Sequence, residues 1–94
     1  MMEMLMTRLF VRHTVSDYST WRKVYDAFDA QRRPMGVTGQ GVYRSVENGN
    51  DVTAWHDFAT AEQAKAFVGS DALKNAMKNA GVLGAPTVWI ASEA

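Results

Sequence analysis

The chain has 94 residues, ten basic and ten acidic side chains, no cysteine, and 47% aliphatic and aromatic residues. This length is typical of one small domain, so we expect a single domain over residues 1–94. The balanced charge disfavours nucleic acids and acidic membranes as partners, and the lack of cysteine excludes disulfides and thiolate chemistry.

The first residues, 1–6, include Glu3 and lack the basic and long apolar parts of a signal peptide. No apolar run elsewhere in the sequence approaches the length that spans a bilayer. We therefore expect a cytoplasmic protein that has no membrane partner.

The first predicted strand covers residues 6–15, where bulky side chains alternate on both faces. Ser16 or Asp17 can cap the helix that follows. Apolar side chains then recur at spacings of three and four residues, which places them on one side of a helix. These residues are Tyr18, Trp21, Val24, Tyr25 and Phe28. Pro34 and Gly36 are expected to end this helix.

A second strand is predicted over residues 39–47, followed by Asn48-Gly49-Asn50. This tripeptide is a strong hairpin signal because its backbone readily adopts positive φ. The third strand, residues 51–58, is therefore expected to run antiparallel to the second.

The second half of the chain repeats the helix and strand order. Thr60 and Gln63 have the spacing of a capping box, Gly69-Ser70 marks a break in the helix, and Gly81 closes it. After a turn at residues 84–86, the last strand is predicted over 87–91. Right-handed crossovers joined by a hairpin predict an α+β, ferredoxin-like βαββαβ fold: a four-stranded antiparallel sheet with two helices on one face.

The alternation of side chains divides the sheet into two faces. Phe58 directly precedes the second helix, so Phe58 and every second residue before it on the third strand are assigned to the helix side. Val15 directly precedes the first helix, and the same reasoning assigns every second residue of the first strand. The helix side then holds Leu9, Val11, His13, Val15, Val52, Ala54, His56 and Phe58. The helix-free side holds Phe10, Arg12, Thr14, Tyr43, Ser45, Thr53, Trp55, Asp57 and Trp89. A register error of one residue would exchange the two sets.

Four aromatic residues on the helix-free side are candidate ligand-binding residues: Phe10, Tyr43, Trp55 and Trp89. Large aromatic surfaces with a few polar groups are typical of small-molecule pockets. Aromatic residues are equally enriched at protein interfaces, so a dimer seam is the alternative.

The candidate catalytic residues are Arg12, His13 and Asp57. Arg12 and Asp57 are expected to pair across the first and third strands, either as an ion pair or as a couple that orients a substrate. His13 is interpreted first as a hydrogen-bonded structural residue near the start of the first helix. His56 lies at the opposite end of the sheet, so the two histidines are not expected to meet, and no metal site is predicted.

Three stretches of the chain resemble the antibiotic biosynthesis monooxygenase-like proteins of the dimeric α/β-barrel superfamily. They are residues 11–18 followed by Trp21, residues 58–67, and residues 77–86. The resemblance implies a homodimer whose sheets pack through their helix-free faces to form a barrel, with a cavity in each subunit. Members include cofactor-independent oxygenases of aromatic polyketides, haem-degrading enzymes and isomerases.

Within that resemblance, Trp55 corresponds to a strand tryptophan that lies beside the substrate in some members. The asparagine that accompanies it on the first strand is missing, since Leu9, Phe10 and Val11 stand there. The histidine of haem-degrading members is also missing from the second helix. The resemblance therefore disfavours haem degradation and permits a cofactor-independent oxygenation of a small aromatic or polyketide-like molecule, with no cofactor expected.

Three functions follow from the residues. The first is an enzyme acting on a small hydroxylated or carbonyl-bearing aromatic molecule. The second is a noncatalytic dimer that binds a ligand or serves assembly. The third is an RNA-binding module, which presents aromatics on the same topology, but the zero net charge and the missing glycine-aromatic signature disfavour it.

Overall fold

The computed structural model describes residues 5–94, in which four strands and two helical segments follow one another in the order strand, helix, strand, strand, helix, strand. The elements are β1 (Thr7–Val15), α1 (Tyr18–Ala27), α2 (Asp29–Arg32), the short 3-10 helix η1 (Arg33–Met35), β2 (Gly39–Arg44), β3 (Asp51–Phe58), α3 (Ala61–Val68), α4 (Asp71–Asn79) and β4 (Val82–Ser92). The predicted order of strands and helical segments is confirmed.

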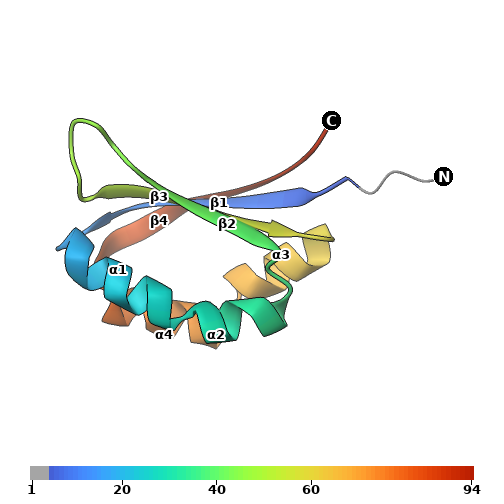
Figure 1. Cartoon of the computed structure of the whole chain (residues 1–94), viewed down its shortest axis with the longest axis horizontal. Helices are drawn as coiled ribbons and strands as arrows, with labels where there is room; N and C mark the ends of the chain where they lie inside the picture. The colour runs from blue at the N-terminus through green and yellow to red at the C-terminus, as the bar shows by residue number, and fades with distance from the viewer. Residues whose placement is uncertain (1–4) are drawn as a thin grey trace.

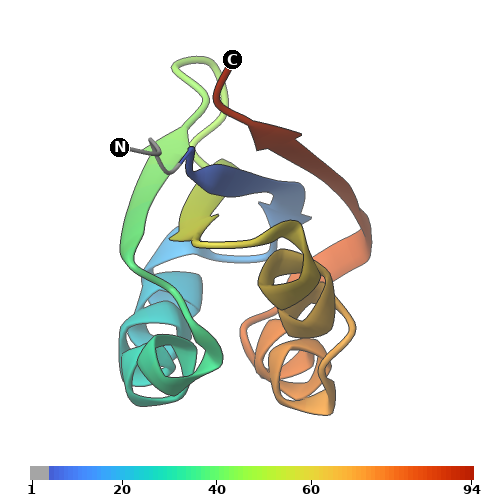
Figure 2. The same ribbon diagram turned by 90° about the vertical axis from the view of Figure 1, so that its right-hand side faces the viewer.

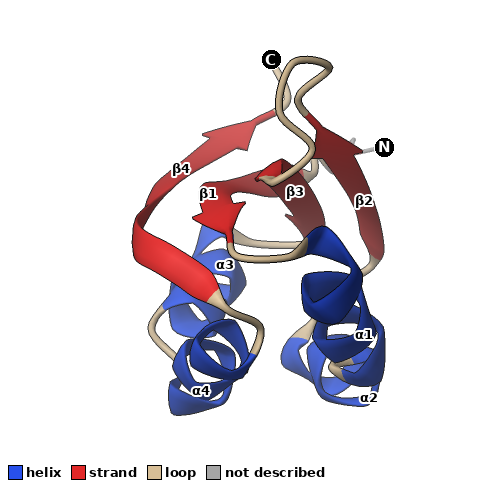
Figure 3. Cartoon of the chain, turned by 90° about the vertical axis from the view of Figure 1, so that its left-hand side faces the viewer, coloured by secondary structure: helices blue, strands red, loops and turns tan. Residues whose placement is uncertain are grey.

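The four strands form one antiparallel sheet in the order β2-β3-β1-β4, with β1 and β3 in the centre. All helices lie on one face of this sheet (Figure 1). Seen end-on, they form two columns, α1 with α2 and α3 with α4, below the curved sheet (Figures 2 and 3). The predicted ferredoxin-like α+β fold is therefore confirmed.

The first helical segment begins at a side-chain cap and is interrupted once. The Asp17 carboxylate accepts a hydrogen bond from the Thr20 amide, which satisfies a free N–H of the first turn of α1. The helix axis is interrupted at Phe28, which separates α1 from α2. Gly36, at φ 103°, then ends the segment, because only glycine adopts this conformation without strain.

The second helical segment is also divided, at the predicted position. The Thr60 hydroxyl accepts from the Gln63 amide and starts α3, which ends at Gly69. The Ser70 hydroxyl accepts from the Leu73 amide and starts α4. Each of the two predicted helices is thus divided into shorter helices, α1, α2 and η1 in the first and α3 and α4 in the second.

Two strand boundaries differ from the prediction. Strand β2 ends at Arg44, because residues 45–50 form a longer loop in which Asn48 accepts from the Asn50 amide. Strand β4 begins at Val82 and includes residues 84–86, which were predicted as a turn. The pairing shifts there from Arg12↔Thr87 to Thr14↔Leu83, so the turn residues form an irregularity within the strand.

The predicted assignment of side chains to the two faces of the sheet is confirmed. Along β1 and β3, alternate residues are buried beneath the helices, and their neighbours are more exposed. The core lies between the sheet and the helices and includes Leu9, Val11, Phe28, Phe58 and Phe67. The other face of the sheet has no covering layer among the described residues (Figure 1).

Residues 1–4, which belong to the segment whose composition argues against a signal peptide, lie outside the described residues. From residue 5 onward, none of the helices combines the length and the apolar character needed to cross a membrane. The same part of the chain contains no group of three His, Asp or Glu side chains that could hold a metal ion.

Candidate functional site

The helix-free face of the sheet carries a row of aromatic side chains. Phe10 on β1 lies opposite Trp55 on β3 and Trp89 on β4. The rings of Phe10 and Trp89 are stacked, with centroids 5.0 Å apart and planes 9° apart. Trp89 is 43% exposed and Tyr43 is 65% exposed. The four aromatic candidates therefore share one face, as predicted, and part of their surface is open.

Trp55 is held between two groups of its own chain. The guanidinium of Arg8 lies 3.8 Å from the ring centroid of Trp55. Gly41 lies opposite Trp55 on β2, and a Cβ atom there would be only 2.4 Å from the indole Nε1. The indole thus lies flat on β2 because residue 41 has no side chain. These contacts leave less of Trp55 free for a ligand than its prediction as a ligand-binding residue assumed.

The expected pairing of Arg12 with Asp57 is wrong. Asp57 accepts two hydrogen bonds from Arg8, at 2.7 and 3.0 Å, and Arg12 donates two to Asp51, at 3.0 and 2.6 Å. The register explains this, because Arg8 lies directly opposite Asp57, whereas Arg12 lies opposite Thr53 and reaches the diagonal neighbour Asp51. Both pairs are partly exposed and bidentate. Neither leaves a free carboxylate that is placed to act as a base.

A hollow on the other side of the sheet contains groups better suited to chemistry. We call it the inner cavity. It has a volume of about 50 Å³ and is lined mainly by apolar side chains. The lining also includes three aromatic and three polar or charged residues that matter for chemistry: Trp21, Tyr25, Phe28, His13, Arg32 and His56. These residues come from β1, β3 and the first helical segment, so the cavity lies between the sheet and that segment, and it extends to α3 and α4.

His13 is buried in the lining of this cavity, and no described residue forms a hydrogen bond with it. Its side chain is 7% exposed, and neither Nδ1 nor Nε2 has a partner within residues 5–94. The ring packs edge-on against Trp21 of α1, with centroids 5.7 Å apart. The prediction that His13 lies near the first helix is confirmed, whereas none of the described residues supplies the predicted hydrogen bond. Burial lowers the pKa of His13, so its imidazole is neutral at pH 7.

His56 is also buried in the lining of this cavity and has one partner. Its Nε2 lies 3.0 Å from the Tyr25 hydroxyl, and its Nδ1 has none among the described residues. Burial and the nearby charge of Arg32 lower the pKa of His56 to about 4. Leu9 pairs with His56 and Val52 with His13, so the two histidines lie four residues apart along the sheet. They do not meet, as predicted, but both line one cavity.

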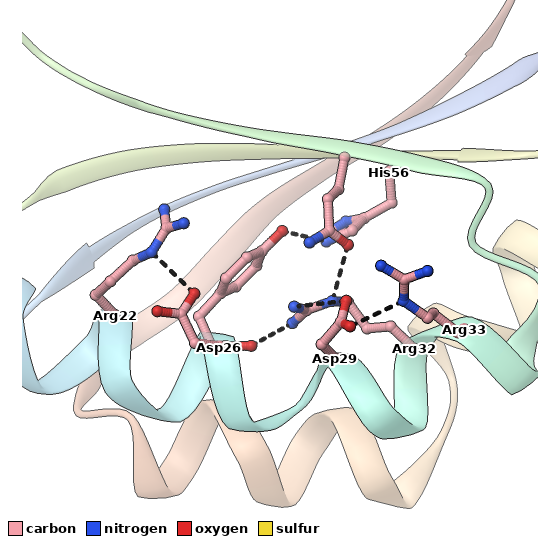
Figure 4. A network of polar contacts seen from close by, with 8 residues as sticks. Arg22, Asp26, Asp29, Arg32, Arg33 and His56 are labelled. Atoms are coloured by element: carbon pink, nitrogen blue, oxygen red, sulfur yellow. Dashed lines mark hydrogen bonds and ion pairs between the residues drawn. The ribbon is translucent and has the colours of Figure 1, made fainter.

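Arg32 is the most unusual residue at this site, because it is a charged side chain that is only 1% exposed. It donates to the Tyr25 carbonyl at 2.5 Å and to the Gln40 side chain at 3.1 Å, and its Nη2 lies 3.5 Å from Asp29. Its guanidinium also lies 3.9 Å from the ring centroid of Tyr25. Figure 4 shows this network, in which the side chain of Arg32 lies along its own helical segment below His56.

The sequence reasoning did not assign Tyr25 or Arg32 to a site. A signal for Arg32 was present, since Tyr18, Trp21, Tyr25, Phe28 and Arg32 continue the alternating three-and-four spacing of one helix face. Nothing in the sequence indicated the bond between Tyr25 and His56. That bond depends on how the helix sits over the sheet.

A second hollow, the outer groove, lies between the first helical segment and α4. Its volume is about 300 Å³, and its lining includes Val24, Phe28, Gln31, Asn75, Ala76 and Asn79. Val24, Phe28 and Ala76 also line the inner cavity. These three side chains therefore separate the inner cavity from a groove that opens to solvent.

Comparison with known proteins supports the fold. No family model matches the sequence, and no curated protein matches it. Similar solved structures include a candidate antibiotic biosynthesis monooxygenase from Caulobacter crescentus, with 18% identity over 97% of this chain and 92% of that chain and a TM-score of 0.75. A candidate enzyme of the same name from Nitrosomonas europaea has 10% identity over 99% of this chain and 94% of that chain, also with a TM-score of 0.75. A conserved protein from Methanosarcina mazei has 16% identity over 94% and 92% of the two chains, and the same score. The predicted resemblance is thus confirmed at the level of the fold.

Proposed function

We propose that the chain is a small homodimeric enzyme of the cofactor-independent monooxygenase type, which acts on a small aromatic molecule bearing hydroxyl or carbonyl groups. The observation that carries this proposal is the presence of three buried imidazole nitrogens that have no partner within residues 5–94, two on His13 and one on His56, both of which line one cavity. Native proteins pair nearly all buried polar groups. A ligand with oxygen atoms would supply the missing partners.

The rest of the inner cavity suits an aromatic ligand. Trp21, Tyr25 and Phe28 supply ring surfaces, and both histidines are neutral, so the site favours a planar, uncharged molecule. The shared fold with structures named as candidate antibiotic biosynthesis monooxygenases supports the reaction type.

The size of the cavity requires the helices to move. A cavity of about 150 Å³ can hold benzene, and the inner cavity has about 50 Å³. Together with the outer groove it reaches the range of small-molecule sites. We propose that ligand entry displaces Phe28, which separates the two spaces and lies at the interruption between α1 and α2.

The reaction needs only a base and dioxygen. A substrate with an acidic methylene in its ring loses a proton to an imidazole and becomes an electron-rich anion. That carbon then forms a bond with dioxygen. One oxygen atom stays as a carbonyl, and the other leaves as water with the two hydrogens of the methylene, so the substrate is oxidised and dioxygen is reduced.

Anthrone, a tricyclic ketone with one such methylene, is a suitable probe. We expect the purified protein to accelerate oxygen uptake by anthrone, with one dioxygen consumed per anthraquinone formed. Ala76→Leu fills the boundary between the two spaces and should slow turnover at least tenfold. Ala66→Leu adds the same volume on the exposed surface of α3 and is the matched control.

Both outcomes of this assay are informative. Equal turnover in wild type and Ala76→Leu would place the reaction outside the inner cavity. No turnover, together with no change in melting temperature in the presence of anthrone, would refute the proposed aromatic substrate class.

The proposed homodimer rests on the helix-free face. This face carries Phe10, Tyr43, Trp55 and Trp89, and the described residues supply no layer to cover it. Burial of such aromatic surface between two copies would stabilise a dimer by about 25 cal/mol per Å² of apolar area. Trp89→Arg should shift the protein to a monomer in light scattering, and Ala66→Arg, on the helical side, should not. A dimer that tolerates Trp89→Arg would contradict this assignment.

A noncatalytic dimer is the second candidate function. The observation that favours it is the small volume of the inner cavity, about 50 Å³, which as it stands holds only a few water molecules. In that case three waters would pair the imidazole nitrogens, and anthrone would neither bind nor react. The oxygen-uptake assay separates the two functions.

A further inference from the structure

We infer that the two buried histidines have different parts in binding: His56 can only donate a hydrogen bond to a ligand, and His13 is the group that accepts one. The inner cavity is therefore matched to a fused-ring aromatic molecule with a carbonyl oxygen at the His56 end and a hydroxyl group at the His13 end. This inference rests on the proposed function and adds to it the polarity of the ligand and the identity of the base.

The argument begins with the 3.0 Å contact between the Tyr25 hydroxyl and Nε2 of His56. Burial raises the pKa of Tyr25, so the phenol keeps its proton at neutral pH. No other acceptor for this proton is recorded in the described part of the chain, so the hydroxyl donates to Nε2. A neutral imidazole has one acceptor nitrogen and one donor nitrogen. The proton of His56 is therefore on Nδ1, the nitrogen that has no partner.

Arg32 keeps His56 in this state. Its guanidinium lies against the ring of Tyr25, with 3.9 Å between the guanidinium carbon and the ring centroid, and its charge disfavours a second proton on His56. The side chains packed around His56 include Tyr25 from α1 and Phe67 from α3, with ring centroids 5.8 and 5.4 Å away. Asp57, next to it on β3, is engaged by Arg8. His56 is thus a fixed donor and a poor base.

His13 lacks all of these constraints. Both of its nitrogens are unpartnered in the described structure, and its recorded ring contact is with Trp21, a neutral side chain. One nitrogen is therefore free to accept a proton. Of the two imidazoles in the inner cavity, only His13 has an acceptor atom available to a ligand.

The spacing of the two histidines sets the length of the ligand. They lie four residues apart along adjacent strands, which corresponds to about 13 Å between their Cα positions. A single ring with two oxygen atoms is too short to reach both imidazoles. A fused bicyclic or tricyclic molecule with its oxygen atoms at opposite ends has a suitable length.

The tautomer of His56 can be measured in the protein without any ligand. The chain has two histidines, so ¹⁵N-histidine labelling gives four ring-nitrogen signals. At pH 7 we expect the His56 proton on Nδ1. Tyr25→Phe removes the donor to Nε2 and should shift His56 toward the Nε2–H form without changing the His13 signals. Tyr18→Phe alters a tyrosine of the same helix that does not contact His56, and it is the matched control.

The polarity of the ligand is tested with three naphthalenes. They are 6-acetyl-2-naphthol, which has a hydroxyl and a carbonyl at opposite ends, 2-acetylnaphthalene, which lacks the hydroxyl, and 2-naphthol, which lacks the carbonyl. Each lost hydrogen bond should weaken binding about fivefold. His13→Leu should abolish the gain in affinity that the hydroxyl group provides over 2-acetylnaphthalene. Tyr25→Phe should reduce the gain in affinity that the carbonyl group provides over 2-naphthol. Circular dichroism of each variant checks that it is folded.

Each result either supports or overturns the inference. A wild-type His56 with its proton on Nε2 overturns the assignment of donor and acceptor, whatever binds. Equal affinity for the three naphthalenes overturns the matched polarity of the ligand. If the tautomer is as expected and none of the three binds, the proposed aromatic ligand class fails, and the matched polarity fails with it. Full retention of the hydroxyl advantage in a folded His13→Leu variant overturns the role of His13.

Discussion

Mild acid should destabilise this protein, and His56 should account for most of the effect. Burial and Arg32 lower the pKa of His56 from its ordinary value of 6.5 to about 4. Between these values the unfolded chain binds a proton that the folded protein does not bind, so stability falls as the pH falls. The contribution of His56 is complete above pH 6.5 and is lost progressively toward pH 4.

The size of this destabilisation follows from the shift in the pKa of His56. For an unfolded pKa of 6.5 and a folded pKa of about 4, the free energy of unfolding decreases by about 2 kcal/mol between pH 7.5 and pH 5. For a domain of this size that corresponds to a decrease in Tm of roughly 10 °C. The pKa of His13 is also lowered by burial, so His13 acts in the same direction.

Urea unfolding followed by circular dichroism at pH 7.5, 6.5, 5.5 and 5.0 measures this effect. His56→Phe keeps a flat ring at the site and removes the titrating group, so the difference between the wild-type and variant curves isolates His56. We expect that difference to change by about 2 kcal/mol over this range. A constant difference would show that His56 titrates normally in the folded protein, and the burial argument would be refuted.

Two further predictions concern the sheet and the buried arginine. Gly41→Ala should destabilise the protein by about 1–3 kcal/mol in the same urea experiment, because its Cβ would be 2.4 Å from Nε1 of Trp55. Gly69→Ala is the matched control, since Gly69 has an ordinary backbone φ and a Cβ there would have no contact below 3.5 Å, and it should be neutral or slightly stabilising. Stability of Gly41→Ala equal to wild type would contradict the described contact. Arg32→Met should raise the pKa of His56 in an NMR titration, because it removes the cation that disfavours the imidazolium. An unchanged pKa of His56 in a folded variant would show that burial alone lowers this pKa.

The fold was largely predictable from the sequence because its signals are local. The alternation of residues along β1 and β3, the caps at Asp17 and Thr60 and the Gly69-Ser70 break are each encoded within a few residues. The boundary of β2 and the irregularity in β4 were not predicted, because they depend on pairing with a neighbouring strand.

The candidate site was predicted less well, because its key contacts join distant segments. Alternation correctly placed His13 and His56 on the helix side, but the partner of His56 is decided by how α1 crosses the sheet. The predicted partner of Asp57 was wrong for the same kind of reason, since a shift of four residues along β1 separates Arg8 from Arg12. Whether the aromatic residues of the helix-free face contact a ligand stays a prediction.

The three tryptophans give each part of this protein its own fluorophore. Trp21 borders the inner cavity, Trp89 is on the open face of the sheet, and Trp55 lies beneath the guanidinium of Arg8. Variants that retain a single tryptophan would thus report separately on events in the cavity and on association of two copies. Emission from the variant that retains Trp21 would follow occupancy of the cavity, and emission from the variant that retains Trp89 would follow the dimer, so binding and assembly can be measured separately without an added dye.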